Sequence, residues 1–203
     1  NIREPFIIYI GTIQPRKNLV RLMEAFSRLS HLRGVDRGKA SFHLGGEQKV
    51  GDEQLQLVIV GKTTENGRKG WMFEDILKTP KQLGIEDRVN FTGFAPTEDL
   101  PTLLSASTMF VLPSLWEGFG IPVLEAMACE TPVEVSSVSS LPEVAGKAGT
   151  TVDPYSVDSI AEALANLLKD EKLRQKKVQL GKMQARQFSW EECARRTLEA
   201  FKN

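Results

Sequence analysis

The sequence predicts a doubly wound α/β fold built on a mainly parallel sheet. Short apolar runs such as Phe6–Ile10, Leu55–Val60 and Met109–Leu112 do not alternate with polar residues, which is typical of strands covered on both faces. Between these runs, apolar residues recur at helical spacing. Strands that alternate with helices favour one parallel sheet with right-handed crossovers.

The first unit is the strand Phe6–Ile10, the polar loop Thr12–Lys17 and a helix. Asn18 is expected to cap this helix at its N-terminus. The apolar face of the helix is formed by Leu19, Leu22, Met23, Phe26 and Leu29. Residues 33–54 are rich in glycine and charge, and we expect a flexible surface insertion there.

The second unit pairs the strand Leu55–Val60 with a helix around Trp71–Leu83. Pro80 is expected to break or kink this helix, because proline cannot donate a helical hydrogen bond. Gly84 suits the left-handed position that follows a helix.

Two further strands follow, each with its helix. The short strand Arg88–Thr92 precedes a helix that Thr97 is expected to cap and that ends near Ala106. The strand Met109–Leu112 leads through a glycine-containing loop into a helix at Pro122–Cys129, where proline is tolerated in the first turn.

The last third of the chain completes the sheet and adds helices. Two short strands, Pro132–Val135 and Thr150–Val152, flank a short helix at Leu141–Ala145. Three helices are expected after them: one from the cap Ser156 to about Lys169, one to about Gln187, and one opened by the capping box Ser189–Glu192.

Composition excludes several classes of protein. The chain has 26 Lys and Arg against 26 Asp and Glu, a net charge of zero, so no general field attracts nucleic acid. No apolar run approaches the roughly 20 residues of a membrane span, and no signal peptide is visible. The two cysteines, Cys129 and Cys193, fit neither a metal pattern nor a disulfide framework. We expect a cytoplasmic protein, free or peripheral to the inner face of the membrane.

Ligands of such folds bind at the carboxyl edge of the sheet, so the loops after the strands are the candidate site. The first loop places Arg16 and Lys17 directly before a helix N-terminus, where the helix dipole disfavours cations. A bound phosphate would reverse this, since backbone amides, dipole and cations would all face it. The alternative is that both side chains extend into water.

A second candidate loop, residues 114–125, contains two glycines and two acids. Gly118 and Gly120 allow backbone amides to come close to a ligand. Glu117 lies in the loop and Glu125 about one turn into the following helix. A carboxylate is a suitable acceptor for a vicinal diol. The alternatives are an ordinary turn, a solvated loop acid and an acid that complements the helix dipole.

The spacing of Glu117 and Glu125, with seven residues between them, resembles the signature of family 4 retaining glycosyltransferases. Other segments fit the same family in the same order, and the resemblance runs from about Pro5 to the end, interrupted by the insertion. These segments are Gly11–Asn18, Phe91–Phe94, Pro113–Trp116, Ala126–Ala128, Ser139–Gly146 and Phe188–Trp190.

This resemblance implies a fold of two Rossmann-like domains, of which residues 1–203 would be the C-terminal, donor-binding one. The N-terminal acceptor domain would be absent; the chain also lacks an initiator Met. The resemblance implies catalytic roles for Lys17 and Arg16 at the donor diphosphate and for Glu117 at hydroxyls of the transferred sugar. The implied substrate-binding residues are Gly11, Thr12, Gly93, Phe94, Gly118, Phe119, Gly120, Ile121 and Glu125. Within this set, Glu125 would hold the ribose diol, and Gly93 and Phe94 would lie beside the base.

The resemblance also implies transfer with retention, no metal and no cofactor, and the sequence has no Asp-x-Asp pair. Three residues depart from the family pattern. Thr12 stands where many members have a basic residue, Glu130 where glycine is usual, and Glu134 within a strand that should be apolar. A carboxylate in such a strand costs free energy unless it is exposed or paired.

The predicted function is donor binding in a hexosyltransferase. The first loop resembles mannosyltransferases, which suggests GDP-mannose as donor and a glycan or lipid-linked acceptor. The chain alone is expected to bind nucleotide with little or no turnover. Alternatives are a sugar-nucleotide epimerase or a phosphorylase of the same fold, and a non-catalytic module that binds nucleotide sugars.

Overall fold

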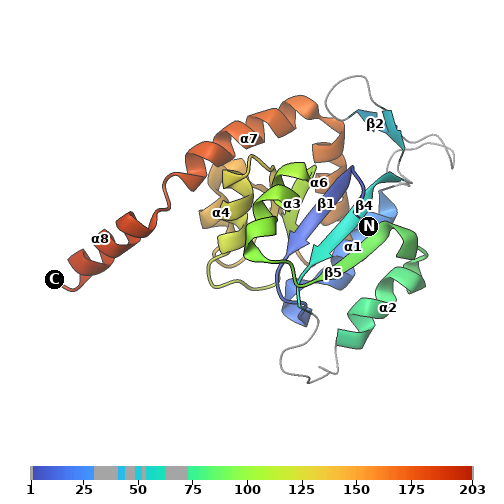
Figure 1. Cartoon of the computed structure of the whole chain (residues 1–203), viewed down its shortest axis with the longest axis horizontal. Coiled ribbons are helices and arrows are strands. Elements are labelled where there is room, and N and C mark those ends of the chain that lie inside the picture. Colours follow the sequence, from blue (N-terminus) through green and yellow to red (C-terminus); the bar gives the residue numbers. More distant parts are fainter. Residues whose placement is uncertain (1, 30–40, 44–48, 52–53, 63–72, 203) are drawn as a thin grey trace.

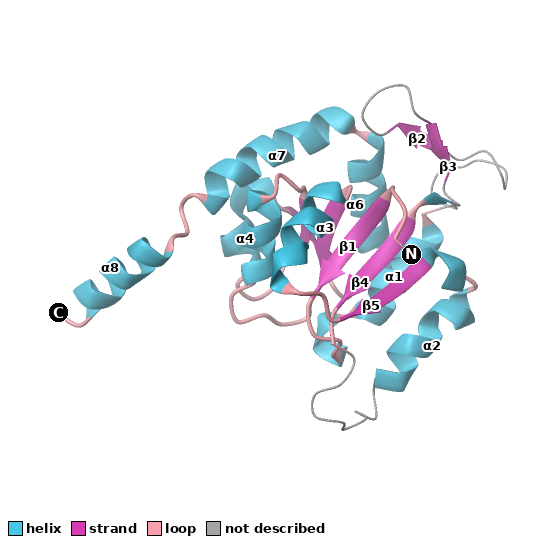
Figure 2. Ribbon diagram, viewed as in Figure 1, coloured by secondary structure: helices cyan, strands magenta, loops and turns pink. Residues whose placement is uncertain are grey.

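Six parallel strands form the central sheet of a computed structural model that describes residues 2–29, 41–43, 49–51, 54–62 and 73–202 (Figures 1 and 2). The strand order is β5-β4-β1-β6-β7-β8. The strands are β1 Phe6–Ile10, β4 Gln56–Val60, β5 Val89–Gly93, β6 Met109–Leu112, β7 Val133–Ser136 and β8 Thr150–Val152. In register, Ile7 of β1 lies beside Leu57 of β4 and Met109 of β6.

The three central strands are buried along almost their whole length. All five residues of β1 and all four of β6 are buried, as are four of the five residues of β4. Helices therefore cover both faces of the sheet, which explains why these strands read as continuous apolar runs. The predicted doubly wound α/β fold is confirmed.

The part of the chain that the structure describes contains eight α-helices, all of which except α8 lie around the sheet (Figure 2). They are α1 Leu19–Arg28, α2 Phe73–Leu83, α3 Leu100–Ala106, α4 Ile121–Ala128, α5 Leu141–Ala145, α6 Val157–Lys169, α7 Glu171–Ala185 and α8 Trp190–Ala200. Helix α1 packs against α6, and α4 packs against α7. None of the described helices has the length and apolar character needed to cross a membrane.

The structure differs from the sequence predictions in several local details. Pro80 lies inside α2, which continues to Leu83, so the proline does not end the helix. Thr97 caps nothing and instead begins a 3-10 turn, Thr97–Asp99, ahead of α3. Within 33–54, two short antiparallel strands occur, β2 Ser41–His43 and β3 Lys49–Gly51. The other residues of that insertion, apart from residue 54, lie outside the described residues, as does Trp71.

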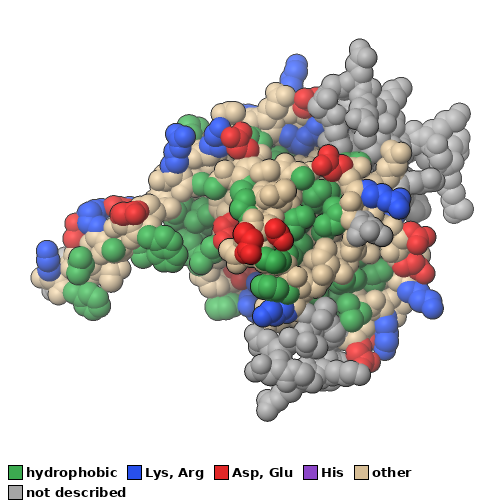
Figure 3. Space-filling model, in the orientation of Figure 1, with side chains coloured by type: hydrophobic (Ala, Val, Ile, Leu, Met, Phe, Trp, Pro, Cys, Tyr) green, Lys and Arg blue, Asp and Glu red, His purple; other side chains and the backbone are tan. Residues whose placement is uncertain are grey.

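Helix α8 extends away from the body of the molecule (Figure 1). None of its residues is buried. Its charged side chains pair with each other along the helix, from Glu192 to Arg195 and Arg196 and from Arg195 to Glu199. Trp190 is 79% exposed and Leu198 60%, and Figure 3 shows hydrophobic side chains gathered along one side of this segment.

Ending the chain after Phe188 is therefore expected to change the free energy of unfolding by less than about 0.5 kcal/mol. Urea unfolding followed by circular dichroism measures this. Ending the chain after Asp170 is the matched comparison, because it also removes α7, in which Arg174 and Gly181 are buried. A clear loss of stability on removing α8 alone would show that the helix packs on the body.

Candidate functional site

The loops at the carboxyl edge of the sheet are joined by backbone hydrogen bonds. These bonds connect segments that are far apart in the sequence. The amide of Gly11 donates to Val60 O (2.9 Å), that of Gly61 to Gly93 O (2.8 Å), and that of Leu115 to Arg16 O (2.8 Å). The loops after β1, β4, β5 and β6 therefore form one surface, as the sequence predicted.

A charged cluster lies where the first of these loops meets the fourth. Lys17 Nζ donates to Glu117 Oε1 at 2.5 Å, and both residues are buried. Arg16 donates from one guanidinium nitrogen to Glu117 Oε2 (3.3 Å) and to Trp116 O (2.9 Å). Ser114 Oγ donates to Glu117 Oε1 at 2.7 Å. The structure thus brings together the three residues predicted to be catalytic.

The carboxylate of Glu117 is held in its ionised form. Burial by itself would raise the pKa of Glu117, but hydrogen bonds from Lys17 and Ser114 and the charges of Lys17 and Arg16 outweigh it. The pKa of Glu117 is therefore lowered, and the carboxylate is an acceptor at neutral pH.

The side chain of Tyr9, in β1, forms a hydrogen bond with the first loop. Its buried hydroxyl donates to the carbonyl of Thr12 at 3.1 Å. A Cβ atom at Gly11 would lie 2.7 Å from this hydroxyl, which explains why glycine follows the strand. Burial, and then the charge of Glu117, raise the pKa of Tyr9, so the phenol remains a donor. This contact fixes the backbone of Gly11 and Thr12, two predicted substrate-binding residues.

Asn18 lies at the N-cap position of α1, but its side chain joins three loops. Its backbone is left-handed (φ 62°), and its side chain makes no cap hydrogen bond. The amide nitrogen instead donates to Pro113 O (3.0 Å) and Pro154 O (2.7 Å). Asn18 therefore occupies the predicted N-cap position without the side-chain bond of a cap, and its side chain connects the loop after β1 to the loops after β6 and β8.

Replacing Asn18 with glycine is expected to lower the free energy of unfolding by about 2 kcal/mol, since two buried hydrogen bonds are lost. Asn18→Ala should cost roughly 1 kcal/mol more, because alanine does not favour a positive φ. Urea unfolding of both variants measures these differences. A glycine variant as stable as the wild type would mean that the two bonds contribute nothing.

The glycine-containing loop lies tightly against α5 and ends at the start of α4. Gly120 has φ 103°, and a Cβ atom there would lie 2.6 Å from Leu141 Cδ2. Phe119 packs edge to face on Phe188, with ring centroids 5.8 Å apart. Gly118 is exposed, and Ile121, the first residue of α4, is 49% exposed. Gly118 and Ile121 are therefore accessible along the carboxyl edge, whereas Gly120 is buried.

The remaining predicted residues lie outside the charged cluster. Gly93 ends β5 with φ 73°, and the ring of Phe94 is 64% exposed with Lys62 Nζ 4.7 Å from its centroid. Glu125 lies in the second turn of α4 with an exposed side chain. It is not in the first turn, where an acid would complement the helix dipole most strongly.

Four residues of this surface were not identified from the sequence as site residues: Lys62, Ser114, Ser139 and Ser140. Ser139 Oγ accepts a hydrogen bond from the amide of Glu117 (3.1 Å). Ser140 Oγ lies 3.1 Å from Glu117 O and 2.9 Å from Phe119 O. The only signal was that three of these residues fall inside segments that resemble the family.

Glu130 and Glu134, the two acids that depart from the family pattern, have different surroundings. Glu130 adopts φ 60°, which explains why glycine is usual there, and its carboxylate pairs with Lys182 Nζ at 2.8 Å. Glu134 lies in β7 and is fully buried, and neither of its carboxylate oxygens has a hydrogen-bond partner in the part of the chain that the structure describes. Complete burial raises the pKa of Glu134 well above its usual value.

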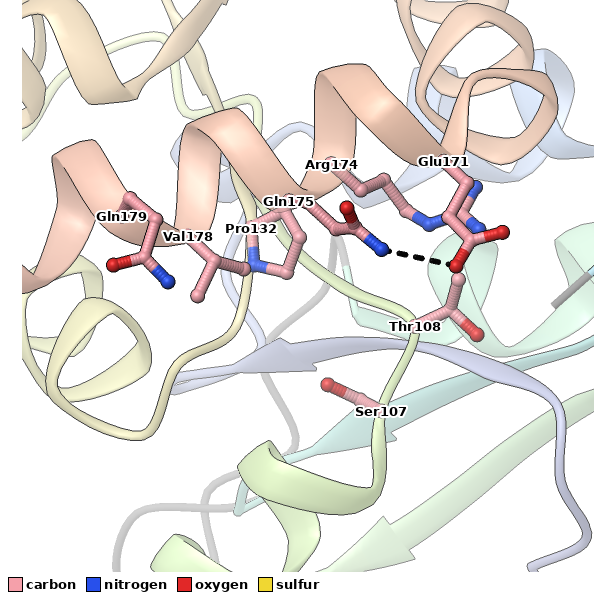
Figure 4. Close-up of a pocket in the computed structure, with 8 residues that line it drawn as sticks. All are labelled: Ser107, Thr108, Pro132, Glu171, Arg174, Gln175, Val178 and Gln179. Atoms are coloured by element: carbon pink, nitrogen blue, oxygen red, sulfur yellow. Dashed lines mark hydrogen bonds between the residues drawn. The ribbon is translucent and has the colours of Figure 1, made fainter. Parts of the chain in front are cut away.

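A cavity of about 320 Å³ lies at the opposite, amino edge of the sheet (Figure 4). It is lined by residues that precede β6 and β7, such as Thr108 and Pro132, and by α7. No predicted site residue lines it. Among the described residues, no three His, Cys, Asp or Glu side chains are grouped as they would be to hold a metal ion.

Comparisons with known proteins agree with the motifs. Residues 1–183 match the family described as glycosyl transferases group 1. O-antigen chain mannosyltransferase B of Escherichia coli is 38% identical over 97% of the chain, which covers 45% of that protein. MMP alpha-(1->4)-mannosyltransferase of Mycolicibacterium hassiacum is 31% identical over 93% of the chain, which covers 44% of that protein. The chain therefore spans less than half the length of these relatives.

Solved structures share the fold. Sucrose-phosphate synthase from Thermosynechococcus elongatus superposes with a TM-score of 0.79 at 26% identity, covering 98% of this chain and 45% of that one. HepE from Anabaena, in complex with UDP and glucose, superposes with a TM-score of 0.77 at 20% identity, covering 98% of this chain and 48% of that one.

Proposed function

The chain belongs to the group 1 glycosyl transferases, and on this basis we propose that it is the donor-binding domain of a retaining glycosyltransferase. The observation that carries the proposal is the cluster of Lys17, Arg16 and Glu117 at the carboxyl edge. Two cations and one carboxylate leave one positive charge there. The N-terminus of α4 lies in the same loop and adds its own attraction for an anion.

The diphosphate of a nucleotide sugar fits this surface. Lys17 is buried and paired with Glu117, whereas Arg16, which also pairs with Glu117, is 41% exposed and would reach a second phosphate from there. When the bond between sugar and diphosphate breaks, negative charge grows on the leaving phosphate. Cations already in place stabilise that charge more than they stabilise the bound substrate, which is the condition for catalysis. We propose that these cations, rather than a metal ion, neutralise the diphosphate; unchanged binding in EDTA tests this.

The neighbouring residues would recognise the rest of the donor. The ionised carboxylate of Glu117 would be an acceptor for hydroxyls of the transferred sugar, next to the exposed residues Gly118 and Phe119. Glu125, whose side chain is exposed on α4, would take the ribose diol. Gly93 and the exposed ring of Phe94 would lie beside the base. In this proposal the nucleoside binds beside Glu125 and Phe94, outside the charged cluster.

Mannose is the sugar that we propose, with GDP as the nucleotide. The relatives named above are mannosyltransferases, and the first loop has the mannosyltransferase-like form Gly11-Thr-Ile-Gln-Pro-Arg-Lys-Asn18. The acceptor would be a glycan or a lipid-linked glycan, and the reaction would take place in the cytoplasm or at the inner face of the membrane.

A second domain would complete the enzyme. The chain spans less than half of its curated relatives, and the apolar side of α8 is exposed on this chain. We propose that α8 packs against an N-terminal domain that also supplies the acceptor site. Without that domain, nucleotide should bind and the sugar should not be transferred.

Incubation of the chain with GDP-mannose, followed by mass spectrometry, tests the proposal. The expected result is intact donor, with tight binding of GDP measured in parallel. Release of an epimerised sugar would support an epimerase, and donor consumption that requires phosphate would support a phosphorylase. Rapid transfer to an added acceptor by the chain alone would contradict the division of the enzyme into two domains.

A further inference from the structure

Two consecutive serines of the loop between β7 and α5 contact the backbone of residues 117–120, the segment called the catalytic loop below. Ser139 Oγ accepts from the amide of Glu117 at 3.1 Å. The hydroxyl of Ser140 lies within hydrogen-bond distance of Glu117 O and of Phe119 O. The peptide groups on both sides of Glu117 are therefore bound from one short segment that begins 22 residues later in the chain.

These contacts are separate from those made by the Glu117 side chain. The carboxylate is bound by Lys17, Arg16 and Ser114, and Arg16 also donates to Trp116 O on the same side of Glu117. The cations come from the loop after β1 and the two serines from the loop after β7, so Glu117 is held from two different loops. The serines supply a constraint that the salt bridges do not.

Ser139 occupies a backbone conformation that serine rarely adopts. Its φ is 58°, in the left-handed region that glycine enters freely. An exposed residue of this kind gains nothing from burial, so the benefit of serine over glycine here lies in its hydroxyl. Strain that persists beside a candidate site is a reason to look for a role in that site.

The catalytic loop also packs against Leu141, the residue that follows the two serines. Gly120 has no room for a Cβ atom because Leu141 lies against it, and Leu141 is fully buried. The segment Ser139–Leu141 is therefore the surface on which Glu117–Gly120 lies. A shift of this segment would move the catalytic loop as a whole.

We propose that Ser139 and Ser140 are positioning residues that set the backbone of Glu117–Phe119 for binding of the donor sugar. This inference rests on the proposed function. Small displacements of a catalytic group are enough to reduce its contribution severely. The serines are expected to affect recognition of the sugar more than recognition of the nucleotide, because they bond the backbone of Glu117 and Phe119, whereas the cations proposed to bind the diphosphate belong to the loop after β1.

The test compares the affinity for GDP with the affinity for GDP-mannose in Ser139→Ala, Ser140→Ala and Ser140→Thr. Both alanine variants are expected to bind GDP within about threefold of the wild type while losing fivefold or more in affinity for GDP-mannose. Ser140→Thr keeps the hydroxyl and should restore the wild-type ratio. Ser107→Ala is the matched control, since Ser107 Oγ bonds a backbone carbonyl at the opposite edge of the sheet.

Hydrogen exchange of the Glu117 amide provides a measurement that needs no ligand. Loss of its acceptor in Ser139→Ala should speed this exchange at least tenfold, with no comparable change in Ser107→Ala. Unchanged exchange, or an unchanged ratio of the two affinities in a folded Ser139→Ala variant, would overturn the inference. If the wild type binds neither GDP nor GDP-mannose while exchange responds as expected, the proposed function fails instead and the contact itself stands.

Discussion

Replacing Lys17 with methionine is expected to weaken the binding of a nucleoside diphosphate about 100-fold, roughly 2.7 kcal/mol. Lys17 is buried, and its ammonium group is held by Glu117 at 2.5 Å. Loss of this buried cation removes a charge-assisted hydrogen bond to the phosphate. It also leaves the negative charge of Glu117 less neutralised, so the carboxylate repels the phosphates more strongly. Calorimetric titration at constant ionic strength measures the change.

Lys78→Met is the matched control for this prediction. Lys78 also pairs with a carboxylate, Glu74 at 3.4 Å, but on the exposed surface of α2. The control removes one positive charge without touching the carboxyl edge and should bind nucleotide as the wild type does. Equal losses in both variants would mean that overall charge, and not the Lys17 site, governs binding.

Replacing Glu134 with valine is expected to raise the free energy of unfolding by about 1–4 kcal/mol at neutral pH. The carboxyl group of Glu134 is fully buried in β7, and neither of its oxygens has a hydrogen-bond partner among the described residues. Valine has a similar volume, favours a strand and needs no partner. Urea unfolding of the two proteins measures the difference.

The effect of Glu134 should depend on pH in a defined direction. Burial raises the pKa of Glu134 well above its usual value of 4.5. Below about pH 4.5 both the folded and the unfolded chain carry the proton, so ionisation adds no penalty. Above it the unfolded chain ionises first, and the stability of the wild type falls relative to Glu134→Val by roughly 1.4 kcal/mol per pH unit until the folded pKa is reached.

Glu134→Gln and Glu162→Gln serve as controls. The first removes only the ionisable group and should abolish the added pH dependence. The second removes an exposed carboxylate from α6 and should leave that dependence in place. A difference between wild type and Glu134→Val that stays constant from pH 4 to pH 8 would show that Glu134 is not held in its neutral form.

The strands could be predicted from the sequence because a strand that is buried on both faces consists of consecutive apolar residues. β1, β6 and β8 have the predicted bounds. The predicted caps Ser156 and Ser189 are confirmed, whereas Asn18 and Thr97 have the residue types of caps but make no side-chain cap bond. The side chain of Asn18 bonds residues 95 and 136 positions away, and no local pattern reports such contacts.

The sequence predicted candidate residues on two loops but not the contacts between these residues. Arg16, Lys17 and Glu117 were identified from two loops about 100 residues apart, and the structure joins them. The pairing of Glu117 with both cations was not predicted. The sequence of each loop suggests a ligand for that loop, but it does not report contacts between the two loops. The contribution of Ser139 and Ser140 depends on a left-handed backbone and on packing against Gly120, which only the three-dimensional arrangement reveals.

The most direct test of the account is calorimetric titration of this chain with GDP, UDP and ADP. The account predicts that one of them, GDP in the first place, binds with a stoichiometry of one and that the other two bind more weakly. Absence of binding by all three to a chain shown to be folded would contradict the assignment of the carboxyl edge as a nucleotide-sugar site.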